Sequence, residues 1–151
     1  MTQLGERLAP HRVLAIDTAI WIYHIEQHPR YRSLTGEILR GVQEGRWEAV
    51  TSVITLLEIT VLPWRLGREG AAREYEALLA HFPHLRVMDV DRDVARVAAR
   101  LRGQYGVHTA DALQAAAALH GGATALVTND RRLRSLGQVL EIVVLDEIAP
   151  A

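Results

Sequence analysis

The sequence predicts an α/β fold in which helices cover both faces of a central, mainly parallel sheet of about five strands. Short runs rich in aliphatic and β-branched residues alternate with longer segments of helical periodicity, which is the pattern of a parallel sheet. The runs are apolar on both faces, as expected where helices cover both sides of a sheet. Because 151 residues suit one domain with a full core, we interpret residues 1–151 as a single three-layer α/β/α sandwich.

Five short runs are the candidate strands. They are VLAI at 13–16, AVTS at 49–52, LRVM at 85–88, ALVT at 125–128 and EIVVL at 141–145. Helical patterns separate each run from the next, and this alternation favours parallel pairing of the strands.

Six longer segments have helical patterns. They cover residues 19–28, 33–45, 54–67, 70–82, 93–106 and 110–122, and RRLRSL at 131–136 predicts a further short helix. Several of these segments end at glycine, the usual residue at a helix C-terminus. No internal repeat, low-complexity segment or linker divides the chain.

Composition narrows the possible classes of protein. Apolar residues make up 49% and charged residues 23%, the balance of a globular protein without a membrane span, and the N-terminus lacks an export signal, so we expect a cytoplasmic location. The net charge of −1 means that any contact with RNA must be local. The absence of cysteine excludes thiolate sites and makes oxygen ligands the default for any metal.

Three acidic residues are isolated in apolar surroundings. Asp17 lies in VLAIDTAIWIY, Glu58 lies in TLLEITVLPW, and Asp111 is the only Asp, Glu or Arg between Arg102 and Asp130. None has an arginine three or four positions away that could pair with it along a helix. Placing a carboxylate in an apolar environment costs free energy of folding unless a cation or a hydrogen-bond donor contacts it. With Asp130, which ends the segment ALVTND, these residues are our candidate site.

The predicted elements bring the four acids toward one edge of the sheet. Asp17 and Asp130 follow strands, at the carboxyl ends where open α/β sheets place their ligand crevice. Asp111 opens a helix and Glu58 lies in the first turns of another. Two carboxylates ~5 Å apart repel by about 3 kcal/mol at an effective dielectric constant of about 20, so a cluster needs a cation. Oxygen ligands favour Mg²⁺ or Mn²⁺, which orient phosphates and activate water.

Each acid also has a structural interpretation. Thr55 and Glu58 form the T-L-L-E pattern of a capping box. Asp17 and Asp130 could each cap the helix that follows. Asp111 fits a first-turn acid that interacts with the helix dipole. Since four such roles would have to coincide at the right places, the combination favours a functional site.

Three motifs follow one another along the chain: IDTAIWIYHIE, TSVITLLEITV and HTADALQAAAALHGGATALVTNDRRL. Their order resembles the PIN domain, and specifically the VapC toxins of bacterial and archaeal toxin–antitoxin pairs. The tandem ADAL…GGATALVTND is the most specific part, and the resemblance covers essentially the whole chain. It implies a parallel-sheet sandwich that uses Mg²⁺ or Mn²⁺ to hydrolyse single-stranded RNA to a 5′-phosphate and a 3′-hydroxyl.

The resemblance also implies roles by position. Asp17 and Asp111 would be the principal metal ligands, and Glu58 and Asp130 would complete the acidic pocket directly or through waters. One of the four would orient the attacking water. Three neighbours would support the carboxylates from a second layer: Thr18, Thr128 and Asn129. Arg131, which follows them, is interpreted as part of a solvated helix face rather than as a phosphate contact.

Other functions remain compatible with parts of the pattern. A PIN-like fold could bind RNA or protein without cleaving, although all four acids are present. An aspartate-based phosphotransferase would need a second Asp two residues after the first, where this chain has D-T-A, and a receiver domain would need a late lysine, which this chain lacks. A stand-alone RNA-processing nuclease is a further alternative to the toxin.

The segment 19–28 predicts a partner surface. Its residues are apolar almost all the way round, whereas a surface helix needs only one apolar stripe. With ITVLPW after Glu58, this favours a homodimer with an apolar groove. In the resembled toxins, the C-terminal helix of a VapB-like antitoxin lies across such a groove and often brings a basic residue to the acidic pocket. We therefore expect Trp21→Glu to weaken antitoxin binding or dimerisation.

Overall fold

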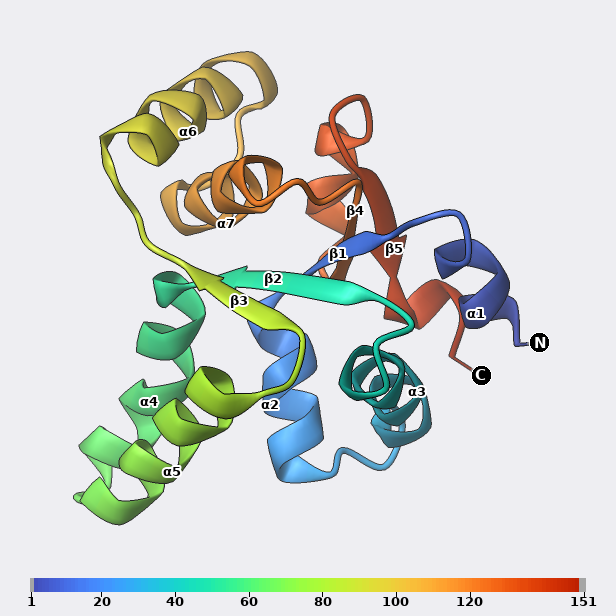
Figure 1. The fold of residues 1–151 in the computed structure, drawn as a ribbon. Helices are drawn as coiled ribbons and strands as arrows, with labels where there is room; N and C mark the ends of the chain where they lie inside the picture. Colours follow the sequence, from blue (N-terminus) through green and yellow to red (C-terminus); the bar gives the residue numbers. More distant parts are fainter. Residues whose placement is uncertain (1, 150–151) are drawn as a thin grey trace.

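The centre of the molecule is a sheet of five parallel strands in the order β3-β2-β1-β4-β5 (Figure 1). The structure is a computed structural model, and it describes residues 2–149. The strands are β1 Val13–Ile16, β2 Glu48–Ser52, β3 Leu85–Met88, β4 Ala125–Thr128 and β5 Glu141–Val144. All five predicted strands are present, with bounds within one residue of the prediction, and the parallel sheet is confirmed.

Both faces of the sheet are buried. Successive side chains of a strand point to opposite faces, so Leu14 and Ile16 of β1 pack into one hydrophobic core and Ala15 packs into the other. The same alternation divides Val127 and Leu126 of β4 between the two cores. This double burial explains why the strands are apolar throughout.

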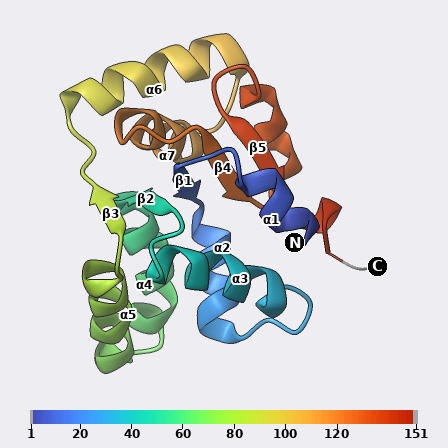
Figure 2. The same ribbon diagram turned by 45° about the vertical axis from the view of Figure 1, so that its right-hand side comes forward.

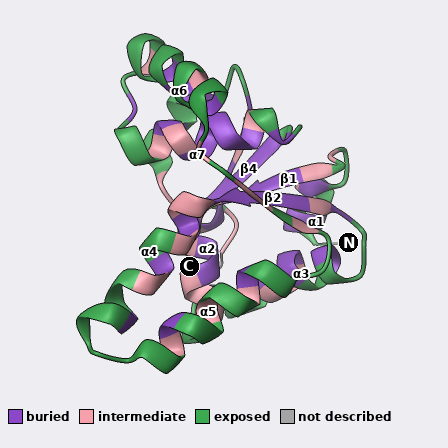
Figure 3. Ribbon diagram, turned by 60° about the vertical axis from the view of Figure 1, so that its left-hand side comes forward, coloured by how far each residue is buried: buried purple, intermediate pink, exposed green. Residues whose placement is uncertain are grey.

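Helices cover each face, which confirms the predicted three layers (Figures 1 and 2). One face carries α1 (Gln3–Leu8), α2 (Thr18–Glu26) and α3 (Arg32–Gln43), and the other carries α6 (Arg92–Tyr105) and α7 (Thr109–His120). Between β2 and β3, α4 (Val53–Arg65) and α5 (Glu69–His81) pack on each other, with many exposed residues (Figure 3). The 3₁₀ helices η1 (Arg131–Leu136) and η2 (Leu145–Glu147) flank β5. Within residues 2–149, no helix has the length and apolar character needed to cross a membrane.

Polar caps decide where several helices begin. The Ser52 hydroxyl accepts a hydrogen bond from the Ile54 N–H at the start of α4, and Asp91 accepts one from the Val94 N–H in α6. At the other end of α6, Gly106 adopts a left-handed conformation with φ +67°, as the glycine pattern predicts. Helix α1, capped by Thr2, was not predicted because six residues carry too little periodicity to be recognised.

Trp21 lies in the core rather than at a partner surface. Its side chain is fully buried, and its ring packs edge-on against Phe82 with 5.1 Å between the ring centroids. The helix α2 contacts α3, α4 and β4 of the same chain, which explains why it is apolar almost all round. The expectation for Trp21→Glu is therefore corrected, because a charge at this buried position would destabilise the fold itself.

Helix α7 lies close to the sheet because its inward side chains are small. The buried residues of this helix are mainly alanines: Ala112, Ala115, Ala116, Ala117 and Ala118. Just beyond the helix, a Cβ on Gly121 would come within 2.8 Å of Val50, so this turn also depends on a small residue. The close approach sets the position of the first turn of α7, which carries Asp111.

Candidate active site

The predicted site residues lie at the carboxyl edge of the sheet, next to the point where the strand order reverses. After β1 the chain builds the sheet toward β2 and β3, and it later returns to place β4 on the other side of β1. Open α/β sheets form a crevice at such a switch point. Asp17 directly follows β1, Asp130 lies just beyond β4, and the Asp17 N–H donates to the Val127 carbonyl at 3.0 Å across this junction.

Asp17 is the most perturbed acid of the site. It precedes α2, and its Oδ1 accepts from the Thr18 N–H at 2.9 Å, which confirms the capping interpretation. Its Oδ2 accepts from the Thr128 hydroxyl at 2.7 Å. Burial raises the pKa of the Asp17 carboxyl to about 6; these two hydrogen bonds oppose the shift, and the charges of Asp111 and Glu58 add to it. The carboxylate of Asp17 thus caps α2 and is at the same time a buried ionisable group.

Glu58 is exposed, and the Thr18 hydroxyl donates to its Oε1 at 2.8 Å. The capping-box interpretation of T-L-L-E is wrong. Helix α4 begins at Val53, two residues before Thr55, and is capped by Ser52, so Thr55 is a buried residue inside the helix. Glu58 is consequently free of the capping role and lies beside the carboxylate of Asp17.

Asp111 lies in the first turn of α7, as predicted. Burial raises the pKa of the Asp111 carboxyl, and the charge of Asp130 raises it further, whereas Arg132 and His108 lower it. Asp111 therefore faces both Asp17 and Asp130 closely enough for their charges to interact.

Asp130 differs from the other three because it has a cationic partner. It caps η1 by accepting from the Arg132 N–H at 2.9 Å, which confirms its capping interpretation. The Arg132 guanidinium also donates to both carboxylate oxygens, with Nη2 2.7 Å from Oδ2 and Nε 3.0 Å from Oδ1. These hydrogen bonds hold the pKa of Asp130 below its usual range. Arg132, rather than Arg131, is the arginine that contacts the site.

The charges of the four acids interact in a chain, Glu58 with Asp17, Asp17 with Asp111 and Asp111 with Asp130, and we call this group the acidic pocket. Among residues 2–149, no three His, Cys, Asp or Glu side chains stand in a ready-made metal-binding arrangement. Within the same range, only Asp130 of the four forms an ion pair. The donor set nevertheless fits a hard cation, because the four carboxylates offer only oxygen ligands, the ligands of Mg²⁺ and Mn²⁺, and three of them form no ion pair within residues 2–149.

Two threonines that the sequence singled out form hydrogen bonds to acids of the pocket. Thr18 donates to Glu58, and Thr128 donates to Asp17 while its oxygen accepts from the Asp130 N–H at 3.1 Å. Thr128 therefore links the ends of β1 and β4.

Asn129 has a different role from the one expected. Its side chain donates to the Tyr23 hydroxyl at 3.1 Å and accepts from the Asp146 N–H at 2.8 Å. It thus ties the turn after β4 to α2 and to the end of β5, and it supports the pocket through the backbone.

Sequence reasoning missed a layer of polar residues beneath the pocket. Gln114, Ser52 and Thr55 are buried and hydrogen-bonded to one another or to Thr18. The available signal was Gln114 itself, because it is the one polar residue in the alanine-rich stretch 112–118.

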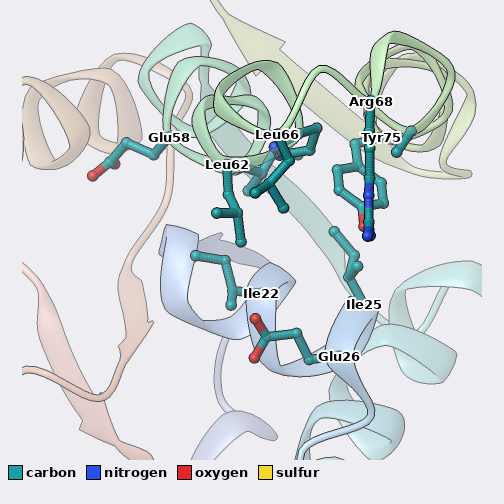
Figure 4. A pocket seen from close by; sticks show the side chains of 11 residues that line it. Ile22, Ile25, Glu26, Glu58, Leu62, Leu66, Arg68 and Tyr75 are labelled. Carbon is teal, nitrogen blue, oxygen red and sulfur yellow. The ribbon is translucent and has the colours of Figure 1, made fainter.

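An apolar groove lies between α2 and the α4–α5 pair (Figure 4). We call it the α2–α4 groove. Its apolar lining is Ile22, Ile25, Ile59, Leu62, Pro63, Leu66, Ala71 and Tyr75. Glu58 lies at one end, and Arg68 and Tyr75 lie at the other (Figure 4). The groove therefore leads along α4 to an acid of the pocket.

The chain matches the PIN domain family over residues 14–139. No curated protein sequence matches it.

Several solved structures share the fold. A toxin–antitoxin complex from Klebsiella pneumoniae superposes with a TM-score of 0.63 and 19% identity, over 87% of this chain and 96% of that one. VapBC2 from Rickettsia felis, bound to a DNA fragment from its promoter, superposes with a TM-score of 0.62 and 17% identity, over 87% of this chain and 96% of that one. VapC20 from Mycobacterium tuberculosis, a sarcin–ricin loop cleaving toxin, superposes with a TM-score of 0.60 and 18% identity, over 75% of this chain and 86% of that one. At these identities the likeness establishes the fold.

Proposed function

Because the chain belongs to the PIN domain family, we propose that it is a Mg²⁺- or Mn²⁺-dependent endoribonuclease and the toxin of a VapBC-type pair. The observation that carries the proposal is the acidic pocket, in which Asp17, Glu58 and Asp111 interact at a switch point of the sheet and form no ion pair with any described residue. Carboxylates are brought together in this way where a divalent cation will neutralise them.

Each acid has a distinct role in the proposed reaction. Asp17 and Asp111 are the principal metal ligands, and Glu58 and Asp130 complete the pocket. When bound, the ion polarises the phosphate and supplies a nucleophilic water. The Thr18 N–H and the Thr128 hydroxyl hold the two oxygens of the Asp17 carboxylate, and the Thr18 hydroxyl holds one oxygen of Glu58, so these hydrogen bonds orient both carboxylates for metal binding.

Arg132 is suited to bind the substrate. Its guanidinium is anchored on Asp130, is otherwise exposed, and lies within 3.4 Å of the His108 ring. An arginine held at the edge of an acidic pocket can contact a phosphate of RNA and offset the repulsion between the pocket and the strand.

We assign the α2–α4 groove to the C-terminal helix of a VapB-like antitoxin. The groove is mainly apolar, with Glu26 on its α2 side, and ends at Glu58, so an amphipathic helix could bury its apolar face there. A basic residue at the end of that helix would reach the pocket and compete with the metal. Solved structures with this fold include toxin–antitoxin complexes, which supports such a partner.

We further propose that the chain forms a homodimer. Leu57, Val61 and Trp64 of α4 are exposed and do not line the groove, and they are spaced to lie on one face of the helix. An exposed apolar face of this kind is typical of a protein–protein interface.

The central test is cleavage of single-stranded RNA by the purified chain. We expect EDTA to abolish cleavage and added Mn²⁺ or Mg²⁺ to restore it. Asp17→Asn and Asp111→Asn should each remove activity without lowering the melting temperature, because each relieves repulsion in the metal-free pocket. Asp93→Asn on the exposed surface of α6 is the control. Cleavage that survives rigorous chelation would refute the proposed function, and a folded protein that binds RNA without cutting it would point to a binding module.

A further inference from the structure

A buried network of polar side chains lies beneath the acidic pocket, with Gln114 at its centre. Gln114 projects from α7, Thr18 from α2, and Ser52 and Thr55 belong to the start of α4. All four side chains are buried. The network therefore joins three elements at the point where they deliver Asp111, Asp17 and Glu58 to the pocket.

Every hydrogen-bonding group of the Gln114 side chain is used. Its Nε2 donates to Thr55 Oγ1 at 2.6 Å and to Thr18 Oγ1 at 3.2 Å, and its Oε1 accepts from the Ser52 hydroxyl. The Ser52 oxygen in turn accepts from the Ile54 N–H at 3.1 Å, so its single proton is directed at Gln114. This arrangement fixes the orientation of the amide, with the two N–H groups toward the threonines.

The Thr18 hydroxyl lies within hydrogen-bond distance of three polar groups: Glu58 Oε1, Thr55 Oγ1 at 2.9 Å and Gln114 Nε2. A threonine hydroxyl carries one hydrogen, and the carboxylate of Glu58, 2.8 Å away, can only accept. With that proton directed at Glu58, Thr18 must act as an acceptor toward both Gln114 and the Thr55 hydroxyl. An amide N–H behind Thr18 satisfies this requirement, whereas a carbonyl or carboxylate oxygen in the same place would attract the proton away from Glu58.

We propose that Gln114 is a positioning residue for the reaction. It directs the hydroxyl proton of Thr18 toward Glu58 and thereby holds the carboxylate of Glu58 in the orientation that the pocket needs to bind its cation and substrate. The inference rests on the proposed nuclease function. It differs from a packing role in one respect, because packing alone predicts a loss of stability without a change in the properties of the pocket.

The first experiment measures Mn²⁺ affinity by calorimetry and kcat per folded molecule for the full chain. Gln114→Met keeps the size of the side chain and removes its donors, and Gln114→Glu keeps its shape but places an acceptor behind Thr18. We expect each variant to weaken Mn²⁺ binding and lower kcat about tenfold or more, as for other residues that support metal ligands. Thr35→Val, which removes a buried hydroxyl of α3 outside the network, should leave both quantities unchanged.

A double-mutant cycle tests whether Gln114 acts through Thr18. Thr18→Val should reproduce the loss seen in Gln114→Met, Thr18→Ser should restore most of it, and the double variant Thr18→Val/Gln114→Met should be no worse than Thr18→Val alone. Additive losses, or a folded Gln114→Met with the Mn²⁺ affinity and kcat of the wild type, would overturn the inference. If Gln114→Met fails to fold, Gln114→Glu decides by the same criteria. A wild-type chain that neither binds Mn²⁺ nor cleaves RNA refutes the proposed function instead.

Discussion

Asp17 is both a helix cap and a destabilising charge. Burial raises its pKa from the ordinary value of 3.8 to about 6, so between these two values the folded chain binds a proton that the unfolded chain releases. Stability therefore falls as pH rises through this window, and at neutral pH the metal-free fold carries a cost of about 3 kcal/mol at this residue. A bound cation would remove that cost, which couples metal binding to stability.

This cost predicts a pH-dependent effect of Asp17→Asn. In EDTA, the free energy of unfolding of the variant relative to the wild type should rise between pH 4 and pH 8 by up to about 3 kcal/mol, because only the wild type acquires the buried charge. Urea denaturation of both proteins across this range measures the difference. The exposed Asp93→Asn should give no such trend. A difference between Asp17→Asn and wild type that stays constant with pH would contradict the proposed environment of Asp17.

At the residue scale, the acids of the pocket could be predicted, but their supporting layer could not. Asp17, Glu58 and Asp111 stand out because a charged residue in an apolar segment lowers stability unless a function or a partner offsets its burial. Gln114 is less conspicuous, because a single glutamine in an alanine-rich helix is compatible with an exposed position. The role of Thr55 was misjudged because sequence alone did not show that α4 begins at Val53.

At the element scale, α4 presents two apolar faces with different neighbours. Leu62 and Leu66 line the α2–α4 groove, whereas Leu57 and Trp64 do not. All four are more than half exposed, at 52%, 54%, 58% and 58% respectively. Helix α4 can therefore serve a helical partner on one face and a second protein surface on the other.

Substitutions on the two faces should separate these partners. Leu62→Gln should weaken binding of the antitoxin at least about tenfold, since a leucine buried on binding contributes roughly 1.5–3 kcal/mol. Leu57→Gln is the matched control, because it changes an equally exposed leucine of the same helix outside the groove. Calorimetry with the product of the gene immediately upstream measures both affinities. Equal losses in the two variants would show that the antitoxin does not use the groove.

The elements themselves were largely predictable, and the exceptions have physical causes. Strands β1 to β5 are apolar on both faces and bounded by helices, so their positions followed from the pattern alone. Helix α2 shows the limit of periodicity. Its all-round apolar character indicated a partner, but α3, α4 and β4 of the same chain cover much of it, while Ile22 and Ile25 line the α2–α4 groove. Sequence alone does not reveal which elements surround a helix.

At the scale of the whole molecule, the exposed face of α4 predicts a dimer. Sedimentation of the free chain at micromolar concentration should give the mass of two chains, and Trp64→Glu should convert it to a monomer with an unchanged fold, because a charge would be buried in the interface. Val139→Glu, which changes an exposed apolar residue outside α4, should remain dimeric. A wild-type chain that stays monomeric at high micromolar concentration would leave Leu57, Val61 and Trp64 without this role.

The strand order has a consequence for the time at which the protein becomes active. β1 belongs to the start of the chain and β4 to its last part, yet they are neighbours in the sheet, and the residues that complete the pocket around Asp17 come from β4 and the turn after it. During translation, Asp17 leaves the ribosome long before Thr128 and Asp130 do. We therefore expect a growing chain to be harmless to the messenger that encodes it and to the ribosome that makes it, because nuclease competence is acquired only when synthesis is nearly finished.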